Sequence, residues 1–305
     1  MLDLRRLRLL RELHRRGTVG AVAEALSYSP STVSQQLAVL EREAGVPLLE
    51  PAGRRVRLTD AALVLVEHAD GLLAGVERAE ADLAAAAGAV VGRARIASFQ
   101  TGSLRLAIPA MSALRAAHPG LRTELVEMEP EPALEALRSR ALDLVIADEY
   151  AGQPRPRSAG ILRRDLLTEP VVVALPEGHR LAGANRAVAL AELAADPWVA
   201  AHPGGGQEAY VRSVCAEHGG FEPDVRHRAD DGHVILGLVG GGHAVTLLPR
   251  LALMAPAPGV AARRVAGADP RRTIFTAVRE DAERRPALRA LADALAAAAR
   301  RARAR

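Results

Sequence analysis

Glycine and proline divide the first 45 residues into three short segments, and this punctuation strongly constrains the fold. Leucines recur at every third position of LDLRRLRLLRELHRR with arginines between them, which predicts an amphipathic helix ending near Gly17. Thr18 can N-cap a second helix, expected to run through Leu26. Pro30 suits the first turn of a third helix, because its missing N–H is not needed there, and Gly45 should end it. Three helices with a tight turn between the last two follow the helix-turn-helix plan.

The third of these segments changes character halfway along its length. In YSPSTVSQQLAVLERE, residues 28–43, an apolar stripe is formed by Val33, Leu37 and Leu40, whereas the first turns carry small hydroxyl and amide side chains. Such side chains at a helix N-terminus can enter the major groove of DNA and reach base edges. The alternative is that the hydroxyls of residues 29–34 only cap the helix.

A predicted wing and a long helix follow. Residues 46–59, VPLLEPAGRRVRLT, hold two strand-like stretches around an Ala-Gly turn. Residues 60–89 form a helical run, for which Thr59 and Asp60 offer an N-cap. Its large apolar residues have near-heptad spacing, at Leu63, Val66, Leu73, Val76 and Leu83. This pattern favours a helix that packs against a copy of itself, the alternative being that the stripe packs on its own domain.

From Gly92 onward, strand-like and helix-like stretches alternate, which implies a mostly parallel sheet. Strands are predicted at 93–98, 123–129, 142–148, 169–176, 197–201 and 243–249, and helices at 102–117, 132–140, 189–194 and 206–217. Apolar stretches near 167–172 and 272–278 suggest that the chain passes twice between two α/β lobes. The expected fold class is therefore α/β with an N-terminal winged helix-turn-helix, a long linker helix and a two-lobed domain.

Composition narrows the class of protein. The 305 residues give room for two domains or slightly more. Cys215 is the only cysteine, so an intrachain disulfide and Cys-rich zinc motifs are excluded. Neither a signal peptide nor a membrane span is expected, which favours the cytoplasm. An aromatic content of 2% argues against binding single strands or RNA by base stacking.

The net charge does not decide whether the protein binds nucleic acid. A net charge of +4 neither proves nor excludes a nucleic-acid partner, because a local basic patch is enough. The C-terminal RRARAR is either a disordered basic tail that adds non-specific DNA affinity or a solvated end.

Six motifs of residues 1–62 belong together: the LDLRRLRLLRELHRRGT opening, AVAEAL, S-x-x-x-V-S-Q-Q-L at 29–37, LE at 40–41, G-V-P-L-L at 45–49 and R-x-x-L-T at 55–59. With these motifs, residues 1–62 resemble the winged helix-turn-helix of LysR-type transcriptional regulators. ALPEGHRLA at 174–182 and GLVGGGHAVTLLP at 237–249 are similar to stretches of the same family. The likeness therefore covers nearly the whole chain.

The resemblance implies a homo-oligomer, a dimer or tetramer, that binds double-stranded promoter or operator DNA. It also implies that a small-molecule effector is sensed between two lobes with the periplasmic-binding-protein fold. The expected domains are a winged helix-turn-helix at 1–59, a linker helix at 60–89, effector sub-domain I at 92–167 with 268–300, and sub-domain II at 168–267. The alternative is a transport-type binding protein without regulatory DNA binding, but such a protein would not carry the first 60 residues.

Five residues of the helix-turn-helix are the candidate DNA contacts. Ser31, Thr32 and Gln35 are expected to face bases, since Gln pairs with adenine and hydroxyls can donate or accept at several bases. Thr18 and Ser34 are expected to contact phosphate, helped by their helix N-termini.

The wing adds two candidate contacts. Arg54 and Arg55 are expected to hold phosphate or enter the minor groove, whereas outside a wing such a pair would be an ordinary solvated cluster. The sequence departs from the family pattern at Pro30-Ser31, where Gln-Pro is common. The base contact by glutamine is therefore expected from Gln35 instead. The sequence departs again at Pro51, where arginine is common, so one phosphate contact is lost.

The candidate effector site starts from SFQTGS, residues 98–103, which follows a predicted strand and opens a helix. Ligands of open α/β folds bind at the carboxyl ends of strands, and helix N-termini bind anions. Gln100, Thr101 and Ser103 are therefore candidates for gripping a carboxylate, ordinary N-capping being the alternative. His202, followed by Pro-Gly-Gly-Gly, repeats the arrangement in the second lobe, where a plain loop is the alternative.

Two acids complete the expected site. Glu129 follows the second strand of this half and Asp148 ends the third, so both should lie at the same edge of the sheet. Acids facing a carboxylate-binding helix end would suit a zwitterion such as an amino acid. The alternative is that either acid is solvated or paired with an arginine.

Enzyme and cofactor interpretations find weak support. GLVGGGHAV lacks the G-x-G-x-x-G spacing and the lysine of a phosphate loop. A metal site built from His227, Asp230, Asp231 and His233 has no helix or strand frame behind its spacing, and no G-x-S-x-G nucleophile elbow occurs. We therefore expect a regulator that is not an enzyme and has no cofactor, no metal and no catalytic residue.

Overall fold

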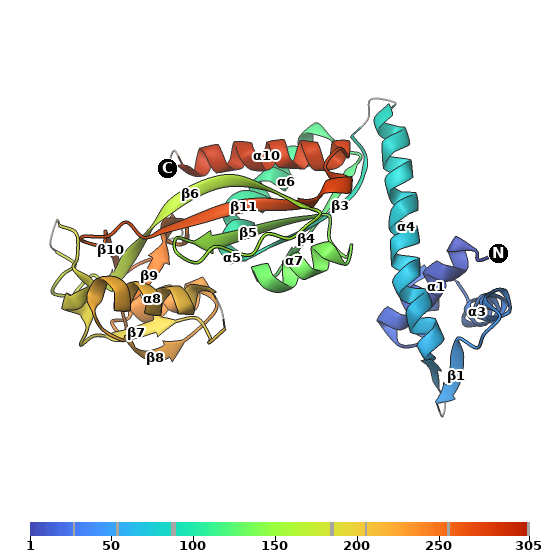
Figure 1. The fold of residues 1–305 in the computed structure, drawn as a ribbon, viewed down its shortest axis with the longest axis horizontal. Coiled ribbons are helices and arrows are strands. Elements are labelled where there is room, and N and C mark those ends of the chain that lie inside the picture. The colour runs from blue at the N-terminus through green and yellow to red at the C-terminus, as the bar shows by residue number, and fades with distance from the viewer. Residues whose placement is uncertain are drawn as a thin grey trace. The chain divides into compact units, whose positions relative to one another are not determined.

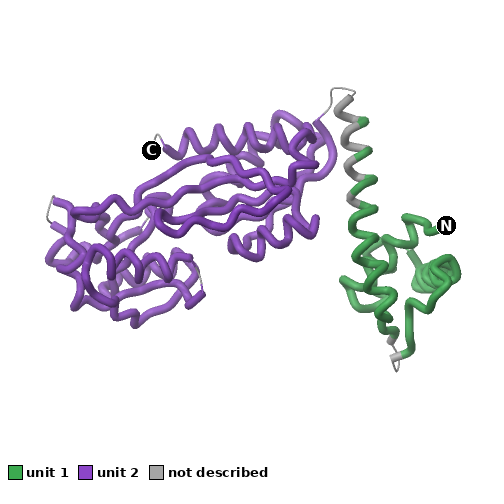
Figure 2. The backbone as a smooth tube through the Cα atoms, in the orientation of Figure 1, with its two compact units in different colours: residues 1–89 green, residues 90–305 purple. Residues whose placement is uncertain are grey.

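The computed structural model describes residues 1–26, 28–52, 55–86, 90–183, 186–204, 206–254 and 257–303. The chain divides into two compact units, residues 1–89 and residues 90–305 (Figure 2). Each unit has its own buried hydrophobic core.

Unit 1 contains three short helices, a two-stranded wing and a long helix (Figure 1). These elements are α1 (Leu4–Arg16), α2 (Val19–Leu26), α3 (Pro30–Ala44), β1 (Leu49–Ala52), β2 (Arg55–Leu58) and α4 (Asp60–Ala86). Gly17 and Gly45 end α1 and α3 with φ angles of 76° and 72°, a left-handed conformation that glycine adopts without steric cost. The predicted order and ends of these helices are confirmed.

The core of unit 1 is built from the leucine spacing of α1 and the apolar stripe of α3. The buried side chains include Leu7, Leu10, Leu13, Val33, Leu37 and Leu40. Burying one such side chain stabilises the fold by about 1.5–3 kcal/mol. Glu41 of α3 joins the wing to this core, because its Oε1 accepts the N–H groups of Leu48 at 2.8 Å and Leu49 at 3.0 Å.

The apolar stripe of α4 has two different environments along its length. Val66 is buried in the core of unit 1, so the first turns pack on their own domain. Leu63, Val76 and Leu83 are 40%, 39% and 73% exposed. Packing on its own domain is thus shown for Val66, whereas self-association through the exposed side chains of α4 stays a prediction.

Unit 2 alternates strands and helices. Its strands are β3 (Gly92–Ser98), β4 (Leu121–Glu127), β5 (Leu144–Tyr150), β6 (Ile161–Pro176), β7 (Pro197–Ala200), β8 (Asp224–Arg228), β9 (Thr246–Pro249), β10 (Val260–Arg263) and β11 (Arg271–Arg279). Its helices are α5 (Gln100–Gly102), α6 (Ile108–Ala117), α7 (Pro130–Arg138), α8 (Gly206–Gly219), α9 (Gly232–Gly240) and α10 (Pro286–Arg303). A π-helical turn, Ser103–Ala107, joins α5 to α6, and 3-10 turns occur at Leu190–Leu193, Arg250–Met254 and Glu280–Ala282.

The main sheet has the strand order β10-β6-β11-β5-β3-β4, with β9 also paired to β6. The expectation of a mostly parallel sheet is wrong for every pair that involves β6 or β11. β3 is parallel to β4 and β5, as expected. β11 is antiparallel to β5 and β6, and β6 is antiparallel to β9 and β10. The reason is that β6 and β11 are the two crossing segments, and the chain runs out along one and returns along the other. A second, two-stranded sheet pairs β7 with β8 in parallel.

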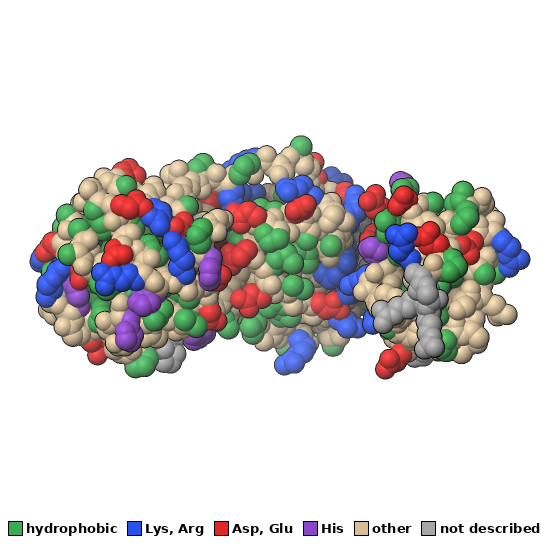
Figure 3. All heavy atoms as spheres, turned by 90° about the horizontal axis from the view of Figure 1, so that it is seen from below, with side chains coloured by type: hydrophobic (Ala, Val, Ile, Leu, Met, Phe, Trp, Pro, Cys, Tyr) green, Lys and Arg blue, Asp and Glu red, His purple; other side chains and the backbone are tan. Residues whose placement is uncertain are grey.

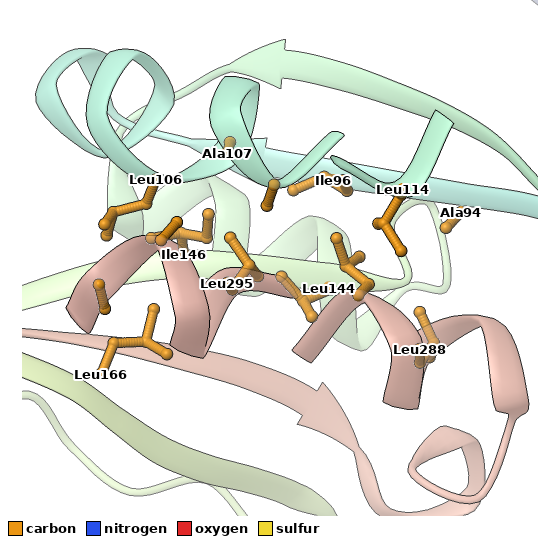
Figure 4. Packing of buried hydrophobic residues seen from close by; sticks show 14 of the residues in the cluster. Ala94, Ile96, Leu106, Ala107, Leu114, Leu144, Ile146, Leu166, Leu288 and Leu295 are labelled. Carbon is orange, nitrogen blue, oxygen red and sulfur yellow. The ribbon is translucent and has the colours of Figure 1, made fainter. Parts of the chain in front are cut away.

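Helices cover both faces of the main sheet. α6 and α10 lie on one face and α7 on the other (Figure 1). Side chains of β5 alternate between the two cores, as the period of a strand requires. Leu144 and Ile146 pack with Leu295 of α10, as Figure 4 shows, whereas Val145 packs with Leu137 of α7.

The long strand β6 links two separate groups of buried residues. Leu166 and Leu167 belong to the core beneath α10, whereas Val171 and Val173 belong to the core around Trp198. β6 and β11 therefore cross a short polar region between the two cores. Part of the charged lining of a cavity in unit 2, including Asp148 and Arg272, lies in this region.

Helix α10 reaches into the C-terminal RRARAR stretch. It extends to Arg303, whose Nη2 donates to the carbonyl oxygen of Leu166 at 2.8 Å. Of the two alternatives for this stretch, the disordered tail is thus wrong for residues 300–303, whose arginines are exposed on the helix.

Within the described ranges, none of the helices combines the length and the apolar character needed to cross a membrane.

Candidate functional site

The N-terminal turns of α3 form the first candidate site. Val33 is buried, whereas Ser31, Ser34 and Gln35 are exposed and Thr32 is half-buried. The helix thus turns its apolar stripe to the core and leaves small polar side chains on the surface of unit 1. This is the arrangement that contact with base edges requires.

The hydroxyl groups at this helix start are linked to one another. Ser29 Oγ accepts the N–H of Thr32 at 3.1 Å and lies 2.8 Å from both Ser31 Oγ and Thr32 Oγ1. Ser29 therefore is the cap. A hydroxyl has one donor and two acceptor lone pairs, so Ser31 and Thr32 keep capacity for a further partner.

The other candidate DNA residues have different placements. Thr18 Oγ1 accepts the N–H of Ala21 at 3.2 Å, so this hydroxyl caps α2. Arg54 lies outside the described residues. Arg55 opens β2 opposite Ala52, and its backbone but not its side chain is described. The structure thus shows the two wing strands, and their contact with DNA through Arg54 and Arg55 stays a prediction.

The second candidate site is a cavity of about 420 Å³ in unit 2. One wall comes from the carboxyl ends of β3, β4 and β5, which are parallel neighbours and so end at the same edge. The opposite wall comes from residues 201–204, from Gly206 and Gln207, and from the start of α9. Four of the predicted effector residues line this cavity, namely Gln100, Thr101, Glu129 and His202, and Asp148 lies there as expected.

Ser103 is the predicted effector residue that the structure does not bring to the cavity. Its side chain is buried, and its Oγ donates to the carbonyl oxygen of Ser98 at 3.2 Å. Since it begins the π-helical turn after α5, its side chain packs back on β3. It holds the helix start on the strand and is not a cavity residue.

Gln100 joins the two walls of the cavity. Its Oε1 accepts the N–H of Gly232 at 3.0 Å, and its Nε2 donates to Asp231 Oδ2 at 3.1 Å. Asp231 is the N-cap of α9 and accepts the N–H groups of His233 and Val234. The N-terminus of α9 is thus occupied by two protein side chains.

Arg272 is the main cavity residue that sequence reasoning missed. It is 4% exposed, and its guanidinium donates to Glu169 at 3.0 Å, Asp148 at 3.2 Å and Thr101 at 3.1 Å. Burial opposes its charge, but the carboxylates of Glu169 and Asp148 outweigh burial and raise the pKa of Arg272. The available signal was weak, because Arg272 follows Arg271 at the start of β11 and only its place in a strand between two buried segments marks it.

A second arginine of the cavity is also engaged. Arg155 donates through Nη1 to Glu131 and through Nε to the carbonyl oxygen of Asp148. Its backbone N–H donates to Glu149 Oε2 at 3.0 Å. The Asp148 carboxylate lies 3.2 Å from Arg272 Nη1 and 3.6 Å from Arg155 Nη2, so it is paired with arginine, which is the alternative that the sequence left open.

Glu129 differs from the other acids. Across the described part of the chain, no side chain makes a hydrogen bond or ion pair with its carboxylate. Glu129 is exposed, but partial desolvation beside the cavity raises the pKa of its carboxyl, the charges of Asp148, Glu131 and Asp230 raise it further, and Arg155 lowers it in part. It is the unpaired acid of this site.

His202 is held on the opposite wall by Asp230. The His202 ring nitrogen Nδ1 lies 2.8 Å from Asp230 Oδ2, and the backbone N–H of His202 donates to Oδ1 at 3.0 Å. The backbone bond first, and the imidazole second, lower the pKa of Asp230. The histidine thus has a fixed position at the cavity edge.

The remaining sequence patterns do not form chemical sites. No three potential metal ligands of the described residues come together, and Asp231 acts as a helix cap. Gly240, Gly241 and Gly242 lie at the carboxyl end of α9, where carbonyl oxygens rather than N–H groups are free, so they do not form a phosphate loop.

Comparison with known proteins covers both units. The family model described as "LysR substrate binding domain" matches residues 87–300, and that described as "Bacterial regulatory helix-turn-helix protein, lysR family" matches residues 4–63. The chain is 31% identical over 233 residues to the "Probable hydrogen peroxide-inducible genes activator" of Mycobacterium avium, covering 76% of this chain and 72% of that protein. It is 28% identical to the "DNA-binding transcriptional dual regulator OxyR" of Escherichia coli (strain K12), covering 90% of this chain and 88% of that protein.

Solved structures show the same fold. The crystal structure of full-length CbnR complexed with the target DNA has a TM-score of 0.69 and 23% identity, covering 97% of this chain and 100% of that one. The two family models together account for nearly the whole sequence, and the chain therefore belongs to the LysR family of bacterial transcriptional regulators.

Proposed function

We propose that this LysR-family regulator binds double-stranded promoter DNA through α3 and the wing, and that a small molecule in the unit 2 cavity modulates this binding. The observation that carries the proposal is that one chain combines an exposed polar helix start on unit 1 with a two-walled cavity in unit 2 that both charged and apolar side chains line. A regulator that responds to a ligand needs both parts.

On the DNA side, Ser31, Thr32 and Gln35 are the proposed base contacts. Ser34 and Thr18 are the proposed phosphate contacts, together with Arg54 and Arg55 of the wing. The solved complex of CbnR with its target DNA supports this assignment, since its fold matches that of this chain. Contacts of this kind position the protein through phosphates and select sequence through bases.

On the effector side, Gln100, Thr101, Glu129 and His202 are the proposed contacts. They come from both walls of the cavity, so a bound molecule would touch both at once. We propose that these walls belong to two sub-domains, residues 92–167 with 268–300 and residues 168–267. A ligand that prefers one arrangement of the walls would shift the population of that arrangement.

Thiol oxidation is a less suitable signal for this chain. The names of two relatives refer to hydrogen peroxide or to OxyR, whereas this sequence has a single cysteine, Cys215. It is fully buried, and burial raises the pKa of its thiol to about 12. Since the thiolate is the reactive form, we propose a non-covalent effector.

We further propose a homodimer joined through α4, acting in the cytoplasm where the DNA is. The exposed side chains of Leu63, Val76 and Leu83 support the self-association. Two-fold symmetry would place two α3 helices on two half-sites of an operator.

A gel-shift titration tests the proposal. Full-length protein is titrated on the intergenic DNA beside its own gene, with competitor DNA and a salt series. We expect specific, salt-sensitive binding that Gln35→Ala weakens by about 1–3 kcal/mol and that Arg54→Ala weakens uniformly across sequences. Arg122→Ala, an exposed arginine of unit 2, is the matched control and should bind like the native protein. Specific binding unaffected by either α3 or wing substitution would contradict the proposed interface.

A further inference from the structure

We infer that the effector carries a cationic nitrogen, as an ammonium or guanidinium group, that pairs with Glu129 inside the unit 2 cavity. The inference rests on the proposal that this cavity is the effector site, and it names the chemical class of the ligand.

The first argument is the charge of the lining. Four carboxylates line the cavity, those of Glu129, Glu131, Asp148 and Asp230, against the two guanidinium groups of Arg155 and Arg272. The lining therefore carries an excess of negative charge. Figure 3 shows a histidine beside acidic side chains on one face of unit 2. A partly enclosed site of one sign concentrates ligands of the opposite sign.

The second argument is that both arginines of the lining already donate hydrogen bonds to protein oxygens. Arg272 is 4% exposed and donates to Asp148, Glu169 and Thr101. Arg155 donates to Glu131 and to the carbonyl oxygen of Asp148. A carboxylate ligand would have to displace protein oxygens from these donors, and each displaced acid would then be left unpaired.

The third argument is that the backbone N–H groups at the start of α9, on the far wall, also donate to protein acceptors. The free N–H groups of α9 would be the natural anion site there. Gln100 accepts the N–H of Gly232, and Asp231 accepts those of His233 and Val234. This helix end therefore has no backbone donor left among these three for an incoming anion.

Glu129 is the group that lacks a partner. Glu129 is an exposed residue of the cavity lining, and its carboxylate has no hydrogen bond or ion pair with any described side chain. Asp148, Glu131 and Asp230 lie around it, whereas the cation that acts on it, Arg155, is already paired with Glu131. A bound cation would supply the missing compensation.

The rest of the lining indicates an organic cation rather than a metal ion. Metal binding needs several ligands at once, and none of the described residues form a group of three. Phe99, Tyr150, Ile235 and Leu248 also line the cavity and provide apolar surface for a carbon skeleton. A volume of about 420 Å³ suits a small metabolite.

The test uses ligands that differ in charge but have similar chain length. Full-length protein is titrated by calorimetry with cadaverine, agmatine, L-lysine, glutarate and pentanediol. We expect binding by the cationic compounds and none by glutarate or pentanediol. Cadaverine against L-lysine separates a plain amine from an amino acid, since only L-lysine adds a carboxylate.

Substitution of Glu129 identifies the anchor. Glu129→Gln keeps the shape of the side chain and removes its charge. We expect it to lower the affinity for a cationic probe by about 10- to 100-fold. Glu135→Gln is the matched control, because Glu135 lies exposed on the next turn of α7 and outside the cavity. It should leave the affinity unchanged.

Three outcomes would overturn the inference. Cationic probes that bind Glu129→Gln as tightly as the native protein would show that Glu129 is not the anchor. Binding of glutarate or pentanediol without binding of the cations would reject the charge class while leaving the cavity as the effector site. Binding by none of the probes would also reject it, and the proposed function would then be judged separately by the gel-shift titration, which needs no effector.

Discussion

The side chain of Gln100 is hydrogen-bonded to the first residue of α9, 132 positions further along the chain: the N–H of Gly232 donates to Gln100 Oε1 at 3.0 Å. The contact connects the carboxyl end of β3 with the opposite wall of the cavity. A Cβ at position 232 would lie 2.6 Å from the same oxygen, so a larger residue there would displace the end of the Gln100 side chain. One side chain thus holds the two walls together beside the proposed effector contacts.

Removing this contact should loosen the start of α9. In Gln100→Ala the amide of Gly232 loses its acceptor, so its hydrogen exchange should become faster and the free energy of unfolding should fall by about 0.5–1.5 kcal/mol. Gly232→Ala should have a similar effect by displacing the Gln100 side chain. Gly237→Ala in the same helix, where no atom lies within 4 Å of the added Cβ, is the control. Equal exchange rates in Gln100→Ala and Gly237→Ala would contradict a holding role.

Among the cavity residues, Arg272 is the one whose substitution should lower the free energy of unfolding most. Arg272→Met leaves Asp148 and Glu169 without their shared buried cation, and breaking a buried pair by removing one partner costs about 3–5 kcal/mol. Urea unfolding monitored by circular dichroism measures the change. Arg122→Met is the surface control, with an expected effect within about 0.5 kcal/mol. A loss no greater than that of the control would mean that the two acids find other partners.

Glu129 should make stability depend on pH in a direction opposite to that of a paired acid. Because its pKa is raised in the folded state, the folded protein holds the proton more tightly, and this contribution to stability is lost as pH rises through the folded pKa. Glu129→Gln should therefore melt at a higher temperature than the native protein at neutral pH. The difference should disappear below the ordinary pKa of glutamate, about 4.3.

The measurement is a series of thermal melts from acid to neutral pH. The charged groups around Glu129 are Asp148 on β5, Glu131 on α7, Asp230 before α9, Arg155, and His202 on the far wall. Glu135→Gln, outside the cavity, controls for the general loss of one negative charge. A melting difference that stays constant across the series would show that the substitution acts through packing rather than through the proton.

The exposed apolar side chains of α4 should hold two chains together. Leu83→Arg places a charge where the side chain is 73% exposed in the single chain, so the fold of unit 1 should persist while the dimer dissociates. Sedimentation velocity measures the oligomeric state. Val64→Arg is the control, because Val64 is 57% exposed on the same helix but lies off the stripe. Dissociation by both variants, or by neither, would argue against the stripe as the contact.

The sequence by itself determined the local features of this protein. The helix ends at Gly17 and Gly45 and the helix start at Ser29-Pro30 depend on residues a few positions away, and the structure has them where the sequence predicts them. The alternation of strands and helices after Gly92, and the position of Gln100 and Glu129 after their strands, follow from the same short-range rules.

Only the tertiary structure decided what depends on pairing between distant segments. The antiparallel placement of β11 between β5 and β6 brings Arg272 to Asp148 and Glu169, and nothing local to residue 272 indicates those partners. Ser103 turned away from the cavity because the π-helical turn packs it on β3. Helix caps are set by hydrogen bonds within one turn, whereas the partners of a buried charge are set by strand register across the whole sheet, and the sequence pattern carries the first kind of information far better than the second.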